Sequence, residues 1–308
     1  MKDKFLDLEI NSINYPMNDK IPPIAIVLLY REAKNGSLFQ DENLALKFMD
    51  AFAETTTGQL LSPNIKEEFK MILSSILAIL HIFIYKVSQD VSIPTYILTT
   101  YMQMPQLKKY LINCVYEIAI VDPDLGGFSF DDLFKILIDD LPNPDLFIPR
   151  IHLYFALAKN QPDLEIFHQM FDSLIIEPML TPEFSIPILK SIANFSDING
   201  YFFSLHAASL FEKLIFLSLN QEIDFQIRNL SMLCIMSIVR NAPEMCKVMD
   251  SFIQNVVAPL VLVASEITDE SDWEYNTNDD SPHQQALDVI SSISELIESH
   301  DGFVIVLQ

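Results

Sequence analysis

Apolar residues recur at steps of three and four along much of the 308-residue chain, which is the spacing of helices with one buried face. In one clear run, after Asp224, the apolar positions are Ile227, Leu230, Leu233, Cys234, Met236 and Ile238. A second run, after Pro182, consists of Phe184, Ile186, Ile188, Leu189, Ile192 and Phe195. Strand-like runs are few, and the one at 304–307 is too close to the end of the sequence to build a sheet. The pattern therefore predicts an all-α protein.

The helix starts recur at a nearly fixed period. Proline at the first helical position, beside a capping residue, marks such a start because its missing N–H has no helical partner there. Six starts follow this pattern, with Ile in place of Pro at the fifth: Pro63, Pro105, Pro144, Pro182, Ile223 and Pro282. Their spacings are 42, 39, 38, 41 and 59 residues. Four of the five match the roughly 40-residue period of HEAT and armadillo repeats.

Each period also contains a second amphipathic segment, and these lie at 130–141, 164–176, 201–219 and 246–264. Neither helix of a pair can bury its apolar face alone, so neighbouring pairs must stack to form a continuous core. We therefore predict that residues 1–308 form a single right-handed α-solenoid of about six or seven HEAT-repeat hairpins. Each hairpin has an outer helix A and an inner helix B. Residues 1–21 are a poorly defined N-terminal segment.

Two inner helices begin with an aspartate that is followed shortly by an arginine. The pairs are Asp145 with Arg150 and Asp224 with Arg228. In HEAT repeats such residues form a ladder between neighbouring repeats, and we predict a structural ladder here. The alternative is that they are ordinary solvated charges near helix ends, where charges interact with the helix dipole.

The 59-residue spacing contains an insert, which we place at 265–281. The insert holds seven acids, no Lys or Arg, and the only tryptophan of the chain. Its candidate partner-binding residues are Glu266, Asp269, Glu270, Asp272, Trp273, Glu274, Asp279 and Asp280. Two interpretations remain open. The insert is either a solvated loop without a role or a docking loop for a basic surface, with the tryptophan as an aromatic anchor.

The chain as a whole is acidic, with 19 Lys and Arg against 42 Asp and Glu and a net charge of −23. This charge argues against nucleic acid and anionic membrane surfaces as partners, because phosphate binding requires Lys and Arg. It favours a basic protein partner. The strongest membrane candidate, 71–85, falls short of the about 20 apolar residues that a spanning helix needs. We predict that it is a buried helix and that the chain has no membrane insertion.

The sequence contains no recognisable catalytic constellation. Glu165 and His168 form one Glu-x-x-His motif, whereas carboxylate-bridged metal sites need the motif twice. Asp122 begins a run similar to a calcium loop, but its twelfth position is Leu133, where a bidentate glutamate is required. We predict no enzyme activity, no cofactor and no metal. Three widely spaced cysteines are predicted to be reduced core residues: Cys114, Cys234 and Cys246.

The residues around the insert carry a family resemblance. An Asp-Trp pair at 272–273 lies in the acidic insert, and Gln-Ala-Leu-Asp at 285–288 follows it in the next helix. Upstream, the runs at 188–192 and 228–231 complete the pattern. This combination resembles the N-terminal third of the importin-β (karyopherin-β) superfamily, and its importin-five branch most of all. The resemblance covers roughly 182–297, and members of the family run to about twenty repeats.

The resemblance implies a nuclear transport receptor, or its N-terminal portion, that works in the cytoplasm and nucleus. Basic cargo would bind an acidic concave side, and the GTP form of the Ran GTPase would bind the N-terminal repeats and the acidic loop. Ran-GTP and cargo would exclude each other, and nucleoporins are a further class of partner. The alternative is a generic HEAT scaffold or adaptor subunit without Ran binding. An enzyme with an unrecognised carboxylate site is the least favoured reading.

Overall fold

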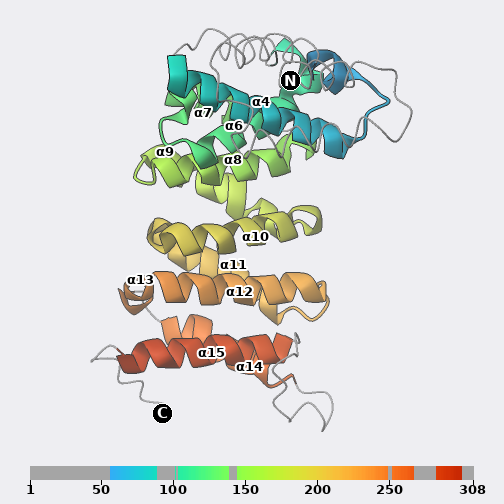
Figure 1. Cartoon of the computed structure of the whole chain (residues 1–308). Helices are drawn as coiled ribbons and strands as arrows, with labels where there is room; N and C mark the ends of the chain where they lie inside the picture. The colour runs from blue at the N-terminus through green and yellow to red at the C-terminus, as the bar shows by residue number, and fades with distance from the viewer. Residues whose placement is uncertain are drawn as a thin grey trace, which may run out of the picture. The chain divides into compact units, whose positions relative to one another are not determined.

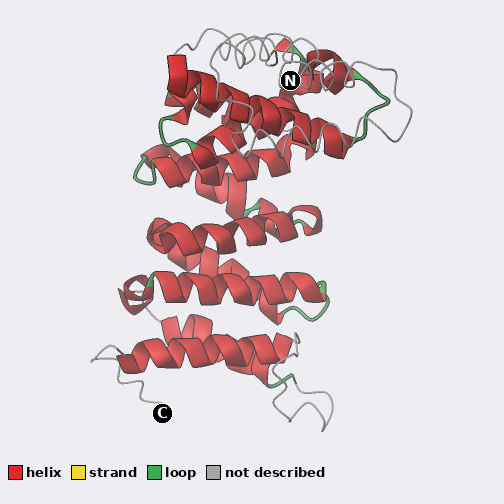
Figure 2. Cartoon of the chain, viewed as in Figure 1, coloured by secondary structure: helices red, strands yellow, loops and turns green. Residues whose placement is uncertain are grey.

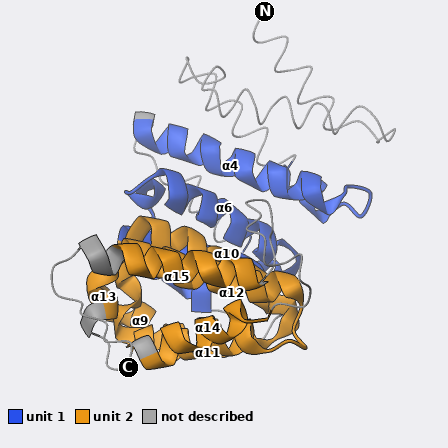
Figure 3. Cartoon of the chain, turned by 90° about the horizontal axis from the view of Figure 1, so that it is seen from below, with its two compact units in different colours: residues 1–160 blue, residues 161–308 orange. Residues whose placement is uncertain are grey.

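The computed structural model describes residues 56–88, 101, 103–138, 144–248, 252–266 and 282–299. These residues are almost entirely helical, and no strand occurs among them (Figure 2). The chain divides into two compact units, residues 1–160 and 161–308 (Figure 3). The all-α prediction is confirmed. The segment 1–21 lies outside the described residues, and the single array of six or seven hairpins stays a prediction.

Unit 1 is built on three long helices that correspond to predicted inner helices. They are α4 (Glu67–Ser88), α6 (Lys108–Val121) and α8 (Phe147–Asn160), and α6 packs against both of the others. A shorter helix, α7 (Phe130–Ile138), contacts α6 and α8. It matches the predicted outer segment at 130–141.

Unit 2 has two layers of helices (Figure 3). The B layer consists of α10 (Pro182–Asn199), α12 (Phe225–Asn241) and α15 (Pro282–Ser299), with α12 packed between the other two (Figure 1). The helices of the A layer follow the predicted outer segments: α9 (Glu165–Phe171), α11 (Ala207–Leu219), α13 (Pro243–Val248) and α14 (Ala258–Ala264). The alternation of outer and inner helices is therefore as predicted.

The outer segments are less regular than their periodicity predicts. A π-helical turn, η5 (Asp172–Ile176), follows α9, and a second, η8 (Ile253–Val257), leads into α14. A 3-10 segment, η7 (Gly200–His206), precedes α11. A proline stands shortly after each π turn, Pro178 and Pro259, and each lacks the N–H that an uninterrupted helix would use. The two π-helical turns are wider than the α-helical turns beside them.

Two inner helices begin at the predicted proline, because Pro182 opens α10 and Pro282 opens α15. Prolines 105 and 144 instead open single 3-10 turns, η2 (Pro105–Leu107) and η4 (Pro144–Leu146), which pass directly into α6 and α8. In η2 the Leu107 amide donates to the Met104 carbonyl at 2.9 Å, so the chain turns more tightly before the α-helix is established.

The two remaining starts are shifted along the chain. Helix α4 begins at Glu67, four residues after Pro63, because a turn comes first. Helix α12 begins at Phe225, and Asp224 is its N-cap, with its carboxylate accepting a hydrogen bond from the Gln226 amide at 2.8 Å. An aspartate is among the best N-cap residues, so the helix begins after it and not at Ile223.

The cysteines and the apolar helix in unit 1 are buried as predicted. All three cysteines are buried and free, and Cys234 Sγ donates to the Leu189 carbonyl at 3.0 Å. By length and composition, 67–86 and 182–219 could each cross a membrane, and at least half of the most apolar part of each stretch is buried inside the fold. In α4 the run from Leu73 to Ala78 is buried, which agrees with the prediction for 71–85.

Candidate partner-binding site

The acidic insert is attached at its root to the B layer of unit 2. Arg228 Nη2 donates to Glu266 Oε2 at 2.5 Å, and Arg228 Nε donates to the Ser218 carbonyl at 2.8 Å. The two side chains are only 9% and 19% exposed, so the pair is a charge-assisted hydrogen bond with little screening by water. Arg228 therefore fixes the first acid of the insert beside the start of α12.

The other candidate residues of the insert lie outside the described residues: Asp269, Glu270, Asp272, Trp273, Glu274, Asp279 and Asp280. Their role in partner binding stays a prediction. The structure establishes that the chain enters the insert from a fixed point, Glu266, and returns at Pro282, the first residue of α15.

The four residues of the predicted ladder have different surroundings. Asp224 caps α12, while Arg228 binds the root of the insert, so their side chains contact different partners. Asp145 is exposed in the turn before α8, whereas Arg150 is 1% exposed and is among the largest fully buried side chains of the described chain. A ladder between repeats stays a prediction for these residues.

Other polar residues join neighbouring inner helices, and the sequence analysis missed them. In unit 2, Asp197 of α10 accepts hydrogen bonds from Ser237 Oγ at 2.7 Å and from Asn241 Nδ2 at 3.0 Å, both on α12. Arg240 of α12 donates to Ser292 Oγ of α15 at 2.7 Å. The sequence offers one indication of these contacts. The two residues of each hydrogen-bonded pair are 40, 44 or 52 positions apart, which is about one repeat or, across the insert, one longer repeat.

Unit 1 contains the same kind of contact between α4 and α6. Asn113 Nδ2 donates to Ser74 Oγ at 2.7 Å, and Tyr110 donates to Glu67 at 2.8 Å. Glu67 also pairs with Lys109 at 2.8 Å, and these hydrogen bonds hold the Glu67 pKa below its ordinary value although partial burial raises it. Hydroxyls, amides and charges of both signs therefore line the seam between inner helices.

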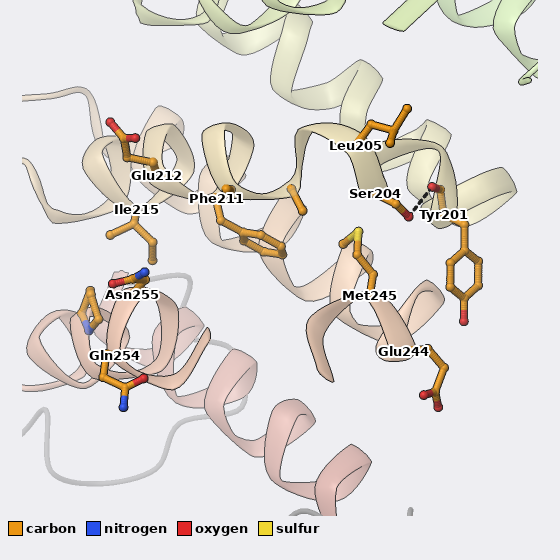
Figure 4. A pocket seen from close by; sticks show the side chains of 13 residues that line it. Tyr201, Ser204, Leu205, Phe211, Glu212, Ile215, Glu244, Met245, Gln254 and Asn255 are labelled. Carbon is orange, nitrogen blue, oxygen red and sulfur yellow. Dashed lines mark hydrogen bonds between the residues drawn. The ribbon is translucent and has the colours of Figure 1, made fainter. Parts of the chain in front are cut away.

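A pocket of about 1020 Å³ lies in the A layer of unit 2, where η7, α11, α13, η8 and α14 surround it (Figure 4). Its floor contains Phe211, Ile215 and Met245, all of which are buried. Four polar residues also line it: Glu212, Glu244, Gln254 and Asn255. The pocket cannot be predicted from the sequence pattern, because its walls come from five elements that are separated along the chain.

The motifs that resembled metal sites have other partners. Asp122 Oδ2 accepts the Gly126 N–H at 3.0 Å and Oδ1 lies 3.6 Å from Lys86 Nζ, so this carboxylate closes a turn. Glu165 accepts from Gln169 at 3.0 Å, while His168 stacks on a phenylalanine ring. Among the described residues no group of three His, Cys, Asp or Glu could hold a metal ion.

One buried histidine is part of the same turn in unit 1. His81 Nε2 lies 2.8 Å from the Gly126 carbonyl, so this nitrogen carries the proton, and the ring stacks on Phe128 with centroids 4.6 Å apart. Burial lowers the pKa of His81 to about 4, although the Gly126 carbonyl and the charge of Asp122 oppose the shift. The side chain is 3% exposed and is a core residue.

Comparison with known proteins gives a fold. No protein-family model matches the chain, and no curated protein matches it by sequence. Solved structures of the karyopherin Kap121p do match: bound to Pho4p (TM-score 0.71, 12% identity), bound to Ste12p (0.71, 13%) and bound to Nup53p (0.70, 12%).

Each match covers 96% of this chain and 30 or 31% of Kap121p, so the chain spans about a third of the length of the solved proteins. Identity this low establishes the fold alone. The predicted α-solenoid fold is therefore confirmed, and the resemblance to karyopherins holds at the level of the fold. The chain has the helical-repeat fold of a karyopherin over about a third of the length of that protein.

Proposed function

We propose that the chain is a nuclear transport receptor of the importin-β type, or the N-terminal portion of one, which binds basic cargo and Ran-GTP in the cytoplasm and nucleus. The observation that carries this proposal is the match to Kap121p over 96% of the chain at TM-scores of 0.70 to 0.71. The matched Kap121p structures are complexes with other proteins, Pho4p, Ste12p and Nup53p. The function is binding, not catalysis, and nucleoporins are a further partner class.

The charge of the chain supports this proposal. A net charge of −23 attracts basic segments and accelerates their association. Seven acids lie in the one insert that interrupts the repeat period, and the buried pair of Arg228 with Glu266 anchors that insert to α12. Fixing the root of the insert reduces the conformational entropy that the loop loses when it docks, compared with a loop whose root is free, so its acids can contribute more to binding.

The mechanism that follows is mutually exclusive binding. Ran-GTP and cargo would bind overlapping parts of one solenoid, so each lowers the affinity for the other by the same factor. A change of nucleotide on Ran then sets the direction of transport. The inner helices of unit 2 expose Lys190 and Arg240 as well as Asp197, so cargo recognition here depends on local acids and not on a uniformly negative face.

A pulldown with Ran loaded with GTP or GDP tests this function. We expect clearly more binding of the GTP form. Equal binding of the two forms would reject the transport receptor and favour the alternative, a HEAT scaffold or adaptor without Ran binding.

A charge-neutralised variant of the insert tests the role of its acids. Replacing Asp269, Glu270, Asp272 and Glu274 by their amides should weaken binding of Ran or basic cargo, and the loss should shrink as salt is added. The matched control neutralises four exposed acids outside the insert: Asp124, Asp163, Glu177 and Glu222. If both variants bind like the wild type, the insert is a solvated loop without a role.

A further inference from the structure

Acids are sparse along α4 and α6, although the chain as a whole is strongly acidic. The two longest stretches of the sequence without an Asp or Glu are 69–89 and 91–116, and Asp90 alone separates them. Both stretches contain lysines: Lys70, Lys86, Lys108 and Lys109. The charge along this pair of inner helices therefore differs from the net charge of −23 of the whole chain.

The starts of α4 and α6 lie side by side, so lysines of both helices come together at one end of the pair (Figure 3). Glu67 of α4 accepts from Tyr110 of α6 at 2.8 Å and pairs with Lys109 at 2.8 Å, so the first turns of the two helices are in contact. Lys70 Nζ lies 5.8 Å from the centroid of the Tyr110 ring. The lysine patch is defined as the four lysines at these two helix starts: Lys66, Lys70, Lys108 and Lys109.

Lysines at these positions oppose the helix dipole. The N-terminus of a helix carries a partial positive charge, so acids stabilise the first turn and lysines destabilise it. Helix α6 nevertheless begins with Lys108 and Lys109, and neither its first turn nor the preceding η2 contains an acid. An anion bound here would relieve the repulsion. A local choice that costs stability in this way is typical of a functional surface.

Only part of the charge of the lysine patch is neutralised within the described chain. Two exposed acids lie among the four lysines, Glu67 and Glu68. Glu67 pairs with Lys109, whereas Lys66 and Lys70 form no ion pair with any residue that the structure describes. The next acid along the seam, Glu117, already accepts a hydrogen bond from a serine of α4. The patch therefore keeps an excess of positive charge.

The groups in and beside the patch are suited to carboxylates. The side chain of Glu67 shows this, because one of its oxygens accepts from Tyr110 and the other lies 2.8 Å from Lys109 Nζ. The exposed side chains of Asn64 and Gln106 stand in the turns before the two helices, and their amides can donate to further carboxylate oxygens. A run of Asp or Glu would find both positive charge and hydrogen-bond donors here.

We propose that the lysine patch binds an acidic segment of a partner protein, a run of Asp and Glu side chains. Charge complementarity determines the kind of partner. A protein segment with a few carboxylates can be confined to the patch, whereas a nucleic acid is negative along its whole length and is repelled by the rest of this acidic chain. The proposal goes beyond the proposed function, which assigns basic cargo to the acids of the chain.

Fluorescence anisotropy with two labelled peptides tests the chemistry. The probe is a short Ser-Gly peptide that carries six Glu, and the comparison peptide carries Gln at the same positions. We expect the Glu peptide to bind at least about tenfold more tightly in low salt, and the difference to shrink as salt is added. Equal binding of the two peptides would overturn the proposal, because an acidic chain without a basic site does not attract Glu.

Matched variants of the full chain test the location. The double variant K66Q/K70Q removes two charges of the lysine patch and should bind the Glu peptide about fivefold more weakly. The control K159Q/K190Q removes two exposed lysines outside the patch, changes the net charge equally and should bind like the wild type. Equal weakening in both variants, or no weakening in K66Q/K70Q, would overturn the proposal. Thermal melts check that both variants are folded.

A labelled RNA of ten uridines tests the class of partner. We expect it to bind more weakly than the Glu peptide, because the acids around the patch repel its phosphates. Tighter binding of the RNA that is lost in K66Q/K70Q would make the patch a nucleic-acid site and overturn the proposal. The titrations contain neither Ran nor basic cargo, so this proposal and the proposed function can fail independently.

Discussion

The buried imidazole of His81 makes the stability of unit 1 depend on pH. In the folded chain its pKa is about 4, because burial opposes the charged form, whereas in an unfolded chain the pKa is the ordinary 6.5. As pH falls below 6.5 the unfolded chain takes up a proton that the folded chain does not. The stability that His81 contributes in its neutral form is therefore present above pH 6.5 and is lost progressively as pH falls toward 4.

The size of this effect follows from the two pKa values. Each pKa unit corresponds to about 1.4 kcal/mol, so the fall from 6.5 to about 4 limits the total loss to about 3 kcal/mol. Between pH 7 and pH 5, where only part of this interval is crossed, the loss is about 2 kcal/mol. The free energy of unfolding of a typical domain is roughly 5 to 15 kcal/mol, so a loss of this size is a large part of the total.

The assay is urea unfolding followed by circular dichroism at pH 7, 6 and 5, for the wild type and for His81→Gln. Glutamine does not titrate, and its amide can still donate to the Gly126 carbonyl that His81 contacts. Carboxylates elsewhere titrate in both proteins, so the difference between the two isolates the imidazole. We expect the wild type to lose about 2 kcal/mol more than the variant between pH 7 and pH 5.

Equal pH dependence of the two proteins would refute this reasoning. The imidazole would then take up a proton in the folded state as readily as in the unfolded chain. In that case the His81 ring would not stay buried in solution.

Three further changes test other parts of the structure. Gly126→Ala should cost at least about 2 kcal/mol of unfolding free energy, because φ is +59° and the new Cβ would lie 2.5 Å from His81 Nε2; Gly58→Ala, with open space around it, is the control. Arg228→Met should lower stability by about 3 kcal/mol, because Glu266 would keep a largely buried charge without its partner; thermal melts of this variant and of the double variant with Glu266→Gln measure it, and the double variant should recover much of the loss. Cys234, whose pKa is raised by burial, should resist iodoacetamide at pH 8 in the native protein and react after unfolding in urea, as mass spectrometry would show.

The sequence predicts the repeat pattern well because that pattern is local. Proline positions and the three-to-four spacing of apolar residues place most helices to within a few residues, and α10 and α15 begin at the predicted prolines. The polar seam between inner helices is harder to predict. Whether Asp197 contacts Asn241 depends on how α10 and α12 are rotated against each other, and that rotation is set by side chains of both helices.

The candidate site also has features that the sequence predicts and features that only the folded structure shows. The composition of the insert and its place in the repeat period are visible in the sequence, but the attachment of Glu266 to Arg228 is not. Arg228 stands four residues after Asp224, and a ladder between repeats stays a prediction; in the structure Asp224 caps α12 and Arg228 binds Glu266. The pocket needs five elements to meet, and the irregular turns η7 and η8 that shape it follow from packing and from Pro259 more than from periodicity.

The distance along the chain between hydrogen-bonded inner helices has a mechanical consequence. The bonds of Asn113 with Ser74, of Asp197 with Ser237 and of Asn241 with Asp197 span 39, 40 and 44 residues, so each joins only adjacent repeats. In an array with nearest-neighbour contacts, small rotations at successive seams add up along the chain. Such an array behaves as an elastic body. In such an array, curvature can change while the packing at each seam between neighbouring helices is kept.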